Sequence, residues 1–150
     1  MKMKRRTIII ACIAVAVIAG GLYGWHEYFR PNVDVASIKP AYHISTNSLL
    51  NEFSKDDSNA TKKYLGKIIA VDGKVKKVEK DERGYYTIVL GTDGNSSSVR
   101  CAADTLHMQS IASLKEGSAV SVKGIFTGYN KDETGLLGSD IQVSRSVINN

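Results

Sequence analysis

The sequence predicts a mainly β, α+β protein: a five-stranded barrel with a helix between its third and fourth strands, an extra N-terminal helix and one transmembrane helix. Three observations lead to this prediction. Much of the second half of the chain alternates apolar and polar residues, which is typical of strands with one buried face. Two of these segments have a central glycine, Gly73 or Gly124, which indicates a bulge or sharp bend. One long run near the N-terminus carries no charge.

Residues 7–25 predict a membrane anchor. They form nineteen residues without a charge, which as a helix would span roughly 28 Å, close to the bilayer hydrocarbon core of about 30 Å. The basic residues among positions 1–6 precede this run. The positive-inside rule therefore places the N-terminus in the cytoplasm and everything after the run outside it. We expect a single-pass protein of the cytoplasmic membrane with a periplasmic or otherwise extracytoplasmic domain.

Two other fates of the N-terminal segment stay open. A cleaved signal peptide also has a basic start and an apolar core, and Val17–Ala19 resembles a cleavage site. Ile9–Cys12 resembles a lipobox, although the apolar run continues past Cys12. Cleavage, lipidation and anchoring all place the domain outside the cytoplasm.

The chain divides into four predicted parts. A basic cytoplasmic tail occupies residues 1–6 and the anchor residues 7–25. Both prolines of the chain, Pro31 and Pro40, fall within 26–44, which we interpret as an extended linker. The folded domain is expected at 45–150.

The domain elements follow from periodicity and from residues that begin or end helices. Ser45 or Thr46 can cap one broken helix or two short ones, which Gly66 ends. Asp104 can cap a short helix that Gly117 ends. Five strands are expected at 67–78, 85–90, 97–102, 119–129 and 136–148. Three strands, a helix and two further strands is the order of an OB-fold, a partly open Greek-key barrel.

Several of these segments also resemble a known family. The segments are Lys63–Lys67, the alternating residues from Ile69 to Val75, Val99–Cys101 and Leu114–Gly117. Over roughly 45–148 the chain resembles the bacterial tRNA_anti-like family of OB-fold lipoproteins. The resemblance implies an OB-fold and an exported or membrane-attached protein. It rests on positions that maintain the fold, so it implies no tRNA binding.

The distribution of charge argues against a general nucleic-acid binder. Five of the 20 basic residues and one of the 15 acidic residues lie in the first thirty positions, which leaves the rest of the chain with a net charge of +1. Such a domain lacks the broad positive field that phosphates require.

No pattern in the sequence predicts catalysis, and we expect no enzyme. The three histidines are scattered, and no glycine-rich phosphate loop or HExxH motif occurs. No ligand spacing predicts a metal site, and we expect no cofactor. Cys12 lies in the anchor and Cys101 in the domain, so no internal disulfide is expected.

A ligand face can be assigned from the fold class. OB-folds bind on the outer face of strands two and three and on the loops beside it. Aromatic rings could stack there on a sugar or base, and an arginine could meet a phosphate or carboxylate. The alternative is ordinary strand composition, with lysines that discourage edge-to-edge pairing. The candidate ligand residues are Lys76, Lys77, Tyr85, Thr87, Arg100 and Tyr129.

These observations favour a non-enzymatic binding module of the cell envelope, anchored in the membrane, with a glycan, peptide or protein as partner. A nucleic-acid-binding OB domain is the first alternative. The near-neutral charge of the domain and its expected extracytoplasmic location argue against it. The second is a structural subunit of a membrane protein complex, which would pack through exposed apolar residues such as Val89 and Ile125.

Overall fold

The computed structural model describes residues 5–28 and 34–149, so most of the predicted basic tail and part of the predicted linker lie outside the described residues. The chain separates into two units, Met1–Val33 and Asp34–Asn150. In the first unit, helix α1 runs from Arg5 to Tyr28, and those of its large apolar side chains that the structure describes, among them Ile13 and Leu22, are exposed. In the part of the chain that the structure describes, no helix is both long enough and apolar enough to cross a membrane. The anchor therefore stays a prediction.

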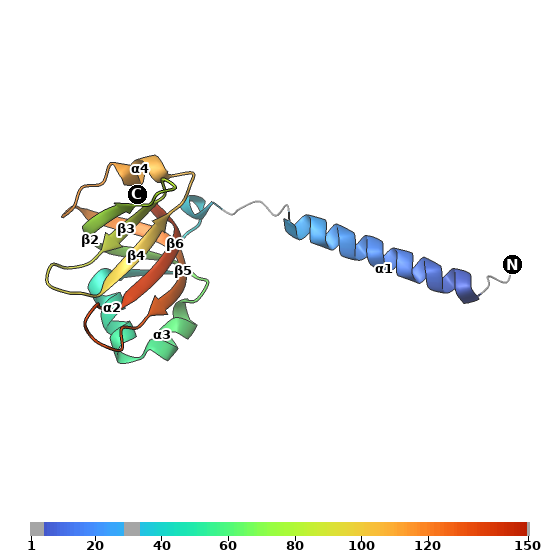
Figure 1. Ribbon diagram of the computed structural model, residues 1–150, viewed down its shortest axis with the longest axis horizontal. Helices are drawn as coiled ribbons and strands as arrows, with labels where there is room; N and C mark the ends of the chain where they lie inside the picture. The colour runs from blue at the N-terminus through green and yellow to red at the C-terminus, as the bar shows by residue number, and fades with distance from the viewer. Residues whose placement is uncertain (1–4, 29–33, 150) are drawn as a thin grey trace. The chain divides into compact units, whose positions relative to one another are not determined.

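The second unit is a closed five-stranded barrel (Figure 1). Its strands lie in the order β2-β3-β4-β6-β5, and β5 pairs back onto β2. Strands β4 and β6 are parallel, and the other neighbours in the barrel are antiparallel. This is the OB-fold topology, so the predicted barrel is confirmed. The strands are β2 (Ile68–Lys80), β3 (Tyr86–Leu90), β4 (Ser98–Ala103), β5 (Ala119–Asn130) and β6 (Asp140–Ile148).

Three helices surround the barrel. Ser45 begins α2 (Thr46–Lys55) by accepting a hydrogen bond from the backbone N–H of Ser48, 3.2 Å away. Asp56 ends α2 and caps α3 (Asp57–Tyr64). The predicted helical region is therefore two short helices rather than one broken helix. The short helix α4 (Met108–Ala112) follows β4, as predicted. In Figure 1, α2 and α3 lie at one end of the barrel and α4 at the other.

The folded unit begins earlier than the sequence predicts. Residues assigned to the linker form a 3-10 turn, η1 (Val35–Ser37), and a strand, β1 (Tyr42–Ser45). Val35 is buried, and β1 pairs in parallel with the first half of β2. Pro40 precedes β1 and does not interrupt it, so this part of the predicted linker belongs to the domain.

The core fills the barrel and continues under α2 and α3. Phe53 of α2 lies against three other rings, with ring centres 4.8 Å from Tyr129, 5.3 Å from Phe126 and 6.1 Å from Tyr64. The predicted inward face of β2 is confirmed, because Ile69, Val71 and Val75 all belong to the core. The remaining buried members of this cluster are Leu49, Leu50, Ala60, Ile88, Leu90, Val99, Cys101, Ile111, Val122, Ile141 and Val143.

Gly73 lies where α2 approaches β2 most closely. A Cβ atom at this position would lie 2.2 Å from Oγ1 of Thr46, a hydroxyl that donates to the backbone oxygen of Asp72 at 3.0 Å. We expect Gly73→Ala to lower the free energy of unfolding by about 1–3 kcal/mol, the usual cost of overpacking. Gly128→Ala is the matched control, because only chain neighbours lie within 4 Å of that Cβ position. Equal thermal midpoints for the two variants would contradict this account of Gly73.

Strand β6 begins at Asp140, whereas the sequence predicts its start at Leu136. Leu136 and Leu137 lie instead in the loop that joins β5 to β6, and they are 82% and 85% exposed. Gly135 and Gly138 flank this pair with φ angles of +70° and +82°, which turn the chain away from extended geometry. We call residues 131–139 the Asp132 loop.

Candidate functional site

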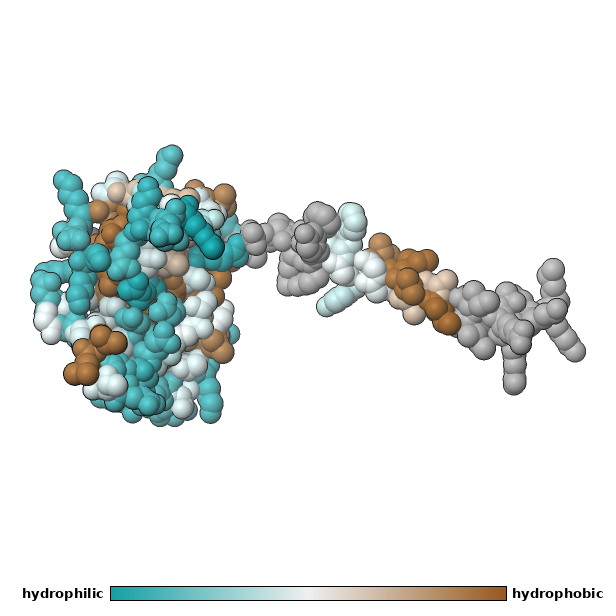
Figure 2. Space-filling model, in the orientation of Figure 1, coloured by the Kyte–Doolittle hydropathy of each residue, from teal (hydrophilic) through white to brown (hydrophobic). Residues whose placement is uncertain are grey.

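The outward face of β2, β3 and β4 has the composition that the sequence predicts. Ile88 and Leu90 belong to the core, so Thr87 and Val89 point to the other side of β3. The strand register then places three residues in one row across the sheet, since Val89 is opposite Lys77 on β2 and opposite Arg100 on β4. This row is the centre of the predicted ligand face. Hydrophilic residues predominate on the face of the domain that Figure 2 shows, and apolar ones form small patches.

A groove of about 430 Å³ lies on this face. We call it the strand-face groove. It brings together three of the six predicted ligand residues: Lys76, Lys77 and Arg100. A register shift between Val75 and Lys77 places two consecutive lysines at the groove, which regular alternation would not do. Its other lining residues are Glu79, Val89, Ser96, Ser98, Glu116, Leu137 and Asp140.

The other three predicted residues lie outside the groove. Tyr85 precedes β3 and is 46% exposed, and Thr87 pairs with Glu79 further along the strands. Tyr129 does not line the groove, because its partly buried ring packs against Phe53 at the edge of the core and lines a separate pocket beside Ser97 and Ser139. The cause is a second register shift, between Phe126 and Gly128, which reverses the alternation of β5 and turns Tyr129 inward.

The cations of the groove are paired within the protein. Arg100 donates to Glu79 at 2.5 Å, and Lys77 lies 3.4 Å from the same carboxylate. Partial burial acts to raise the pKa of Glu79, but the hydrogen bonds and positive charges of Arg100 and Lys77 together outweigh it and leave the pKa below the ordinary value. Lys76 donates to the backbone oxygen of Asn95 at 2.8 Å. Three cations and three carboxylates line the groove, so its net charge is close to zero.

The Asp132 loop forms one wall of the groove through Leu137. One carboxylate oxygen of Asp132 accepts from the N–H and hydroxyl of Thr134, and the other accepts from the N–H groups of Leu137 and Gly138 at 2.7 and 2.8 Å. The loop is also joined to the chain before β4, since Ser139 N–H donates to the Ser97 hydroxyl at 3.0 Å. The sequence predicts a loop at 130–135 but places Leu136 and Leu137 in the following strand. Gly138, a typical turn residue, is the signal that could have extended the loop.

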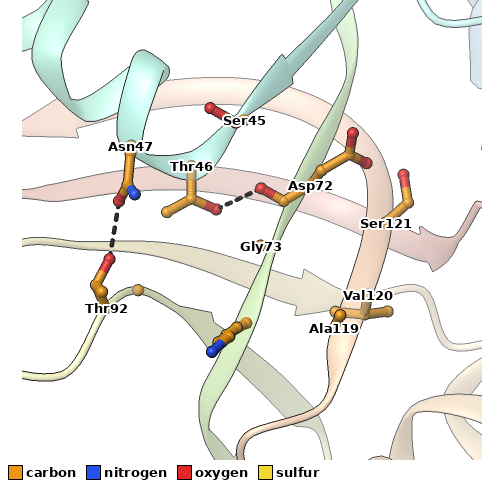
Figure 3. A pocket seen from close by; sticks show the side chains of 11 residues that line it. Ser45, Thr46, Asn47, Asp72, Gly73, Thr92, Ala119, Val120 and Ser121 are labelled. Carbon is orange, nitrogen blue, oxygen red and sulfur yellow. Dashed lines mark hydrogen bonds between the residues drawn. The ribbon is translucent and has the colours of Figure 1, made fainter.

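A larger cavity, of about 560 Å³, lies beside Gly73 (Figure 3). Its polar groups bond mainly to one another: Thr92 donates to Asn47 at 2.8 Å, and Thr46 donates to the backbone of Asp72. Hydrogen bonds from Ser121 and His43 lower the pKa of Asp72. No aromatic ring lines this cavity. Because this cavity lies off the strand-face row that the fold class predicts for binding, we assign the candidate site to the groove.

Neither a metal centre nor a reactive thiol is found in the domain as described. No group of three or more His, Cys, Asp or Glu side chains in the described part of the chain could hold a metal ion. Cys12 and Cys101 are both free thiols, and Cys101 is fully buried. That burial raises the pKa of the Cys101 thiol to about 12.

Cys101 is therefore expected to be inert in the folded chain. In a Cys12→Ser variant it is the one remaining thiol. Because the thiolate is the reactive form, we expect alkylation by iodoacetamide at pH 8 to be at least about a thousandfold slower than in 6 M guanidinium, where the thiol is exposed and its pKa is near 8.5. Mass spectrometry of timed samples measures both rates. Fast modification of the folded variant would contradict the burial of this side chain.

Comparisons with known proteins agree with the fold. A family model described as tRNA_anti-like matches residues 1–139. The crystal structure of a candidate nucleic acid-binding lipoprotein from Klebsiella pneumoniae is similar over 81% of this chain and 100% of that one, with a TM-score of 0.56 and 16% identity. At that identity the likeness shows the fold alone. No curated protein matches the chain.

Two aminoacyl-tRNA synthetases are more distant. The asparaginyl enzyme of Entamoeba histolytica has a TM-score of 0.39 and 15% identity over 55% of this chain. A candidate aspartyl enzyme of Leishmania major has a TM-score of 0.45 and 14% identity over 87% of this chain. The chain spans only 20% and 25% of their lengths, and likenesses this weak support no conclusion about function.

Proposed function

The chain belongs to the tRNA_anti-like family, and from that premise we propose that it is a non-enzymatic binding module of the cell envelope. In this proposal α1 anchors the chain in the cytoplasmic membrane, the OB domain lies outside the cytoplasm, and the strand-face groove contacts the partner. The observation that carries the proposal is that Lys76, Lys77 and Arg100 meet in one groove on the face that OB-folds use for binding.

The composition of α1 supports the anchor. The uncharged run of residues 7–25 falls within this helix. Several large apolar side chains from Ile13 to Leu22 are more than half exposed, and a helix that is apolar on all sides requires an apolar environment. A bilayer supplies that environment, and basic residues at the start of the helix favour a cytoplasmic N-terminus.

The contents of the groove support binding rather than catalysis. General acid–base or nucleophilic catalysis needs a nucleophile, a base and an orienting group within reach of one another. Neither histidine nor cysteine is among the residues that line the groove. The hydroxyl of Ser98 donates to the Asp140 carboxylate at 2.5 Å, and this serine is almost completely buried.

The proposal is tested by binding assays on the full chain in lipid nanodiscs. The probes are a fifteen-residue oligothymidylate, chitotetraose and a library of random linear peptides. We expect one class to bind, and a Lys77→Ala/Arg100→Ala variant to bind it at least about tenfold more weakly. Lys62→Ala/Lys115→Ala is the matched control, because these lysines lie on α3 and before β5, outside the groove. Equal binding by both double variants, or binding of none of the probes, would contradict the proposal.

A nucleic-acid-binding OB domain is the second candidate. The three cations on the ligand face favour it, and a general affinity for phosphates would appear as a steep fall in binding with salt. Of the two residues predicted for the structural-subunit alternative, Val89 is only 6% exposed, whereas Ile125 is partly exposed. Leu137, which lines the groove, and the adjacent Leu136 are more exposed than either.

A further inference from the structure

We infer that the strand-face groove binds a polypeptide segment, with two adjacent apolar side chains of that segment held against the exposed Leu136 and Leu137. This inference rests on the proposed function and specifies the class of its partner. Charge, the absence of a stacking ring and the Asp132 loop each contribute to it.

The charge of the groove fits a polypeptide better than a polyanion. Arg100 and Lys77 both contact the Glu79 carboxylate, and Lys76 is bonded to a backbone oxygen. A bound phosphate would either break these contacts or lie next to the negatively charged Glu79 carboxylate. Two negative charges at such a distance repel each other. Alternating cations and carboxylates instead match a segment that carries both signs of charge.

The groove also lacks a platform for rings. Sequence-tolerant binding of single-stranded nucleic acid depends on bases stacked on aromatic side chains, and sugars are commonly held by the same kind of ring. No aromatic residue lines the groove. Tyr129, a ring predicted for this role, packs against Phe53 at the edge of the core and lies outside the groove.

The Asp132 loop supplies an apolar contact that is already ordered. Leu136 and Leu137 are almost fully exposed. Leu137 is one of the residues that line the groove. The hydrogen bonds to Asp132 hold the loop before any partner arrives, so little conformational entropy is lost on binding. Covering such side chains removes apolar surface from water, which is favourable.

Side chains rather than backbone pairing must provide the recognition. Strands β3 and β4 are paired on both sides, so the centre of the groove offers no free strand edge for an added strand. The Ser96 hydroxyl and the charged groups that line the groove can satisfy the polar groups of a bound segment. The expected partner segment is therefore two neighbouring large apolar residues flanked by acidic and basic residues.

The experiment selects from a phage-displayed library of random twelve-residue peptides on the full chain in nanodiscs, with oligothymidylate and chitotetraose titrated in parallel. We expect enriched peptides with an apolar pair, whose affinity changes little between 50 and 300 mM NaCl. A Leu136→Ser/Leu137→Ser variant should bind them at least about tenfold more weakly. Leu106→Ser is the control, because Leu106 is 74% exposed and lies outside the groove.

The outcomes separate this inference from the proposed function. Both leucines are exposed, so the double variant should keep its thermal midpoint, and a large loss of stability would contradict the exposed placement on which the inference rests. Oligothymidylate or chitotetraose binding that is lost in Lys77→Ala/Arg100→Ala but kept in Leu136→Ser/Leu137→Ser would overturn the inference and leave the proposed function intact. Absence of any groove-dependent binding would overturn both.

Discussion

Replacing Phe53 with alanine is expected to lower the free energy of unfolding by about 3–5 kcal/mol, the usual cost of removing a buried aromatic side chain. Phe53 is 1% exposed and joins α2 to the barrel through Tyr129 and Phe126. Truncation would leave a cavity at the point where helix and barrel meet, and three rings would lose a partner.

Chemical denaturation of the full chain in detergent micelles measures the effect, with Tyr85→Ala as the control. Tyr85 is about half exposed and is not part of the core, so its loss should change the stability by no more than about 0.5 kcal/mol. If both variants lost the same amount, Phe53 would not be the centre of the core.

Asp132→Asn is expected to release the Asp132 loop. Each carboxylate oxygen of Asp132 accepts hydrogen bonds from two donors, one oxygen from Thr134 and the other from Leu137 and Gly138. Either orientation of an asparagine amide would place an NH₂ group against two donors. We expect amide exchange in residues 131–139 to accelerate about tenfold or more, because protection depends on the local opening free energy. Deuterium uptake followed by mass spectrometry measures it.

The same carboxylate predicts how the loop responds to acid. The hydrogen bond from the Thr134 hydroxyl, together with those from the backbone N–H groups of Gly138 and Leu137, lowers the pKa of Asp132 far below its ordinary value. A lowered pKa contributes stability above the unfolded value of about 3.9, and that stability is lost as the pH falls through the folded pKa. The loop should therefore stay ordered from pH 7 to about pH 4. Glu133→Gln, which changes the adjacent exposed carboxylate, is the control, and a loop that loosened near pH 5 would contradict the prediction.

The sequence was sufficient for the barrel because strand alternation and the short helix after the third strand are local signals. Gly124 was also predictable as a site of irregularity, and it lies within the register shift between Lys123 and Ile125. Arg100 could be assigned to the ligand face from the alternation of its strand alone, whereas Lys77 reaches this face only through the register shift after Val75. Such parity arguments hold as long as a strand is regular.

The errors arise where long-range contacts override local pattern. Strand β1 has four residues, too few for a periodic signal, and it forms because β2 offers a free edge. The bulge that turns Tyr129 inward depends on pairing with β6, which no local pattern reveals. Leu136 and Leu137 resemble the start of a strand until the hydrogen bonds to Asp132 are known. The cations that line the groove could therefore be proposed from the sequence, whereas the position of Leu137 in its wall could not.

The most direct test of the membrane-held, extracytoplasmic binding module is a combined measurement of topology and processing. The full chain is expressed in a Gram-negative host, spheroplasts are treated with protease, and the membrane-bound product is weighed by mass spectrometry before and after treatment. The account predicts an unprocessed, membrane-bound chain that protease reduces to its anchor. A domain that remains protected would place the groove in the cytoplasm, contradict the envelope function and make nucleic acid the leading partner.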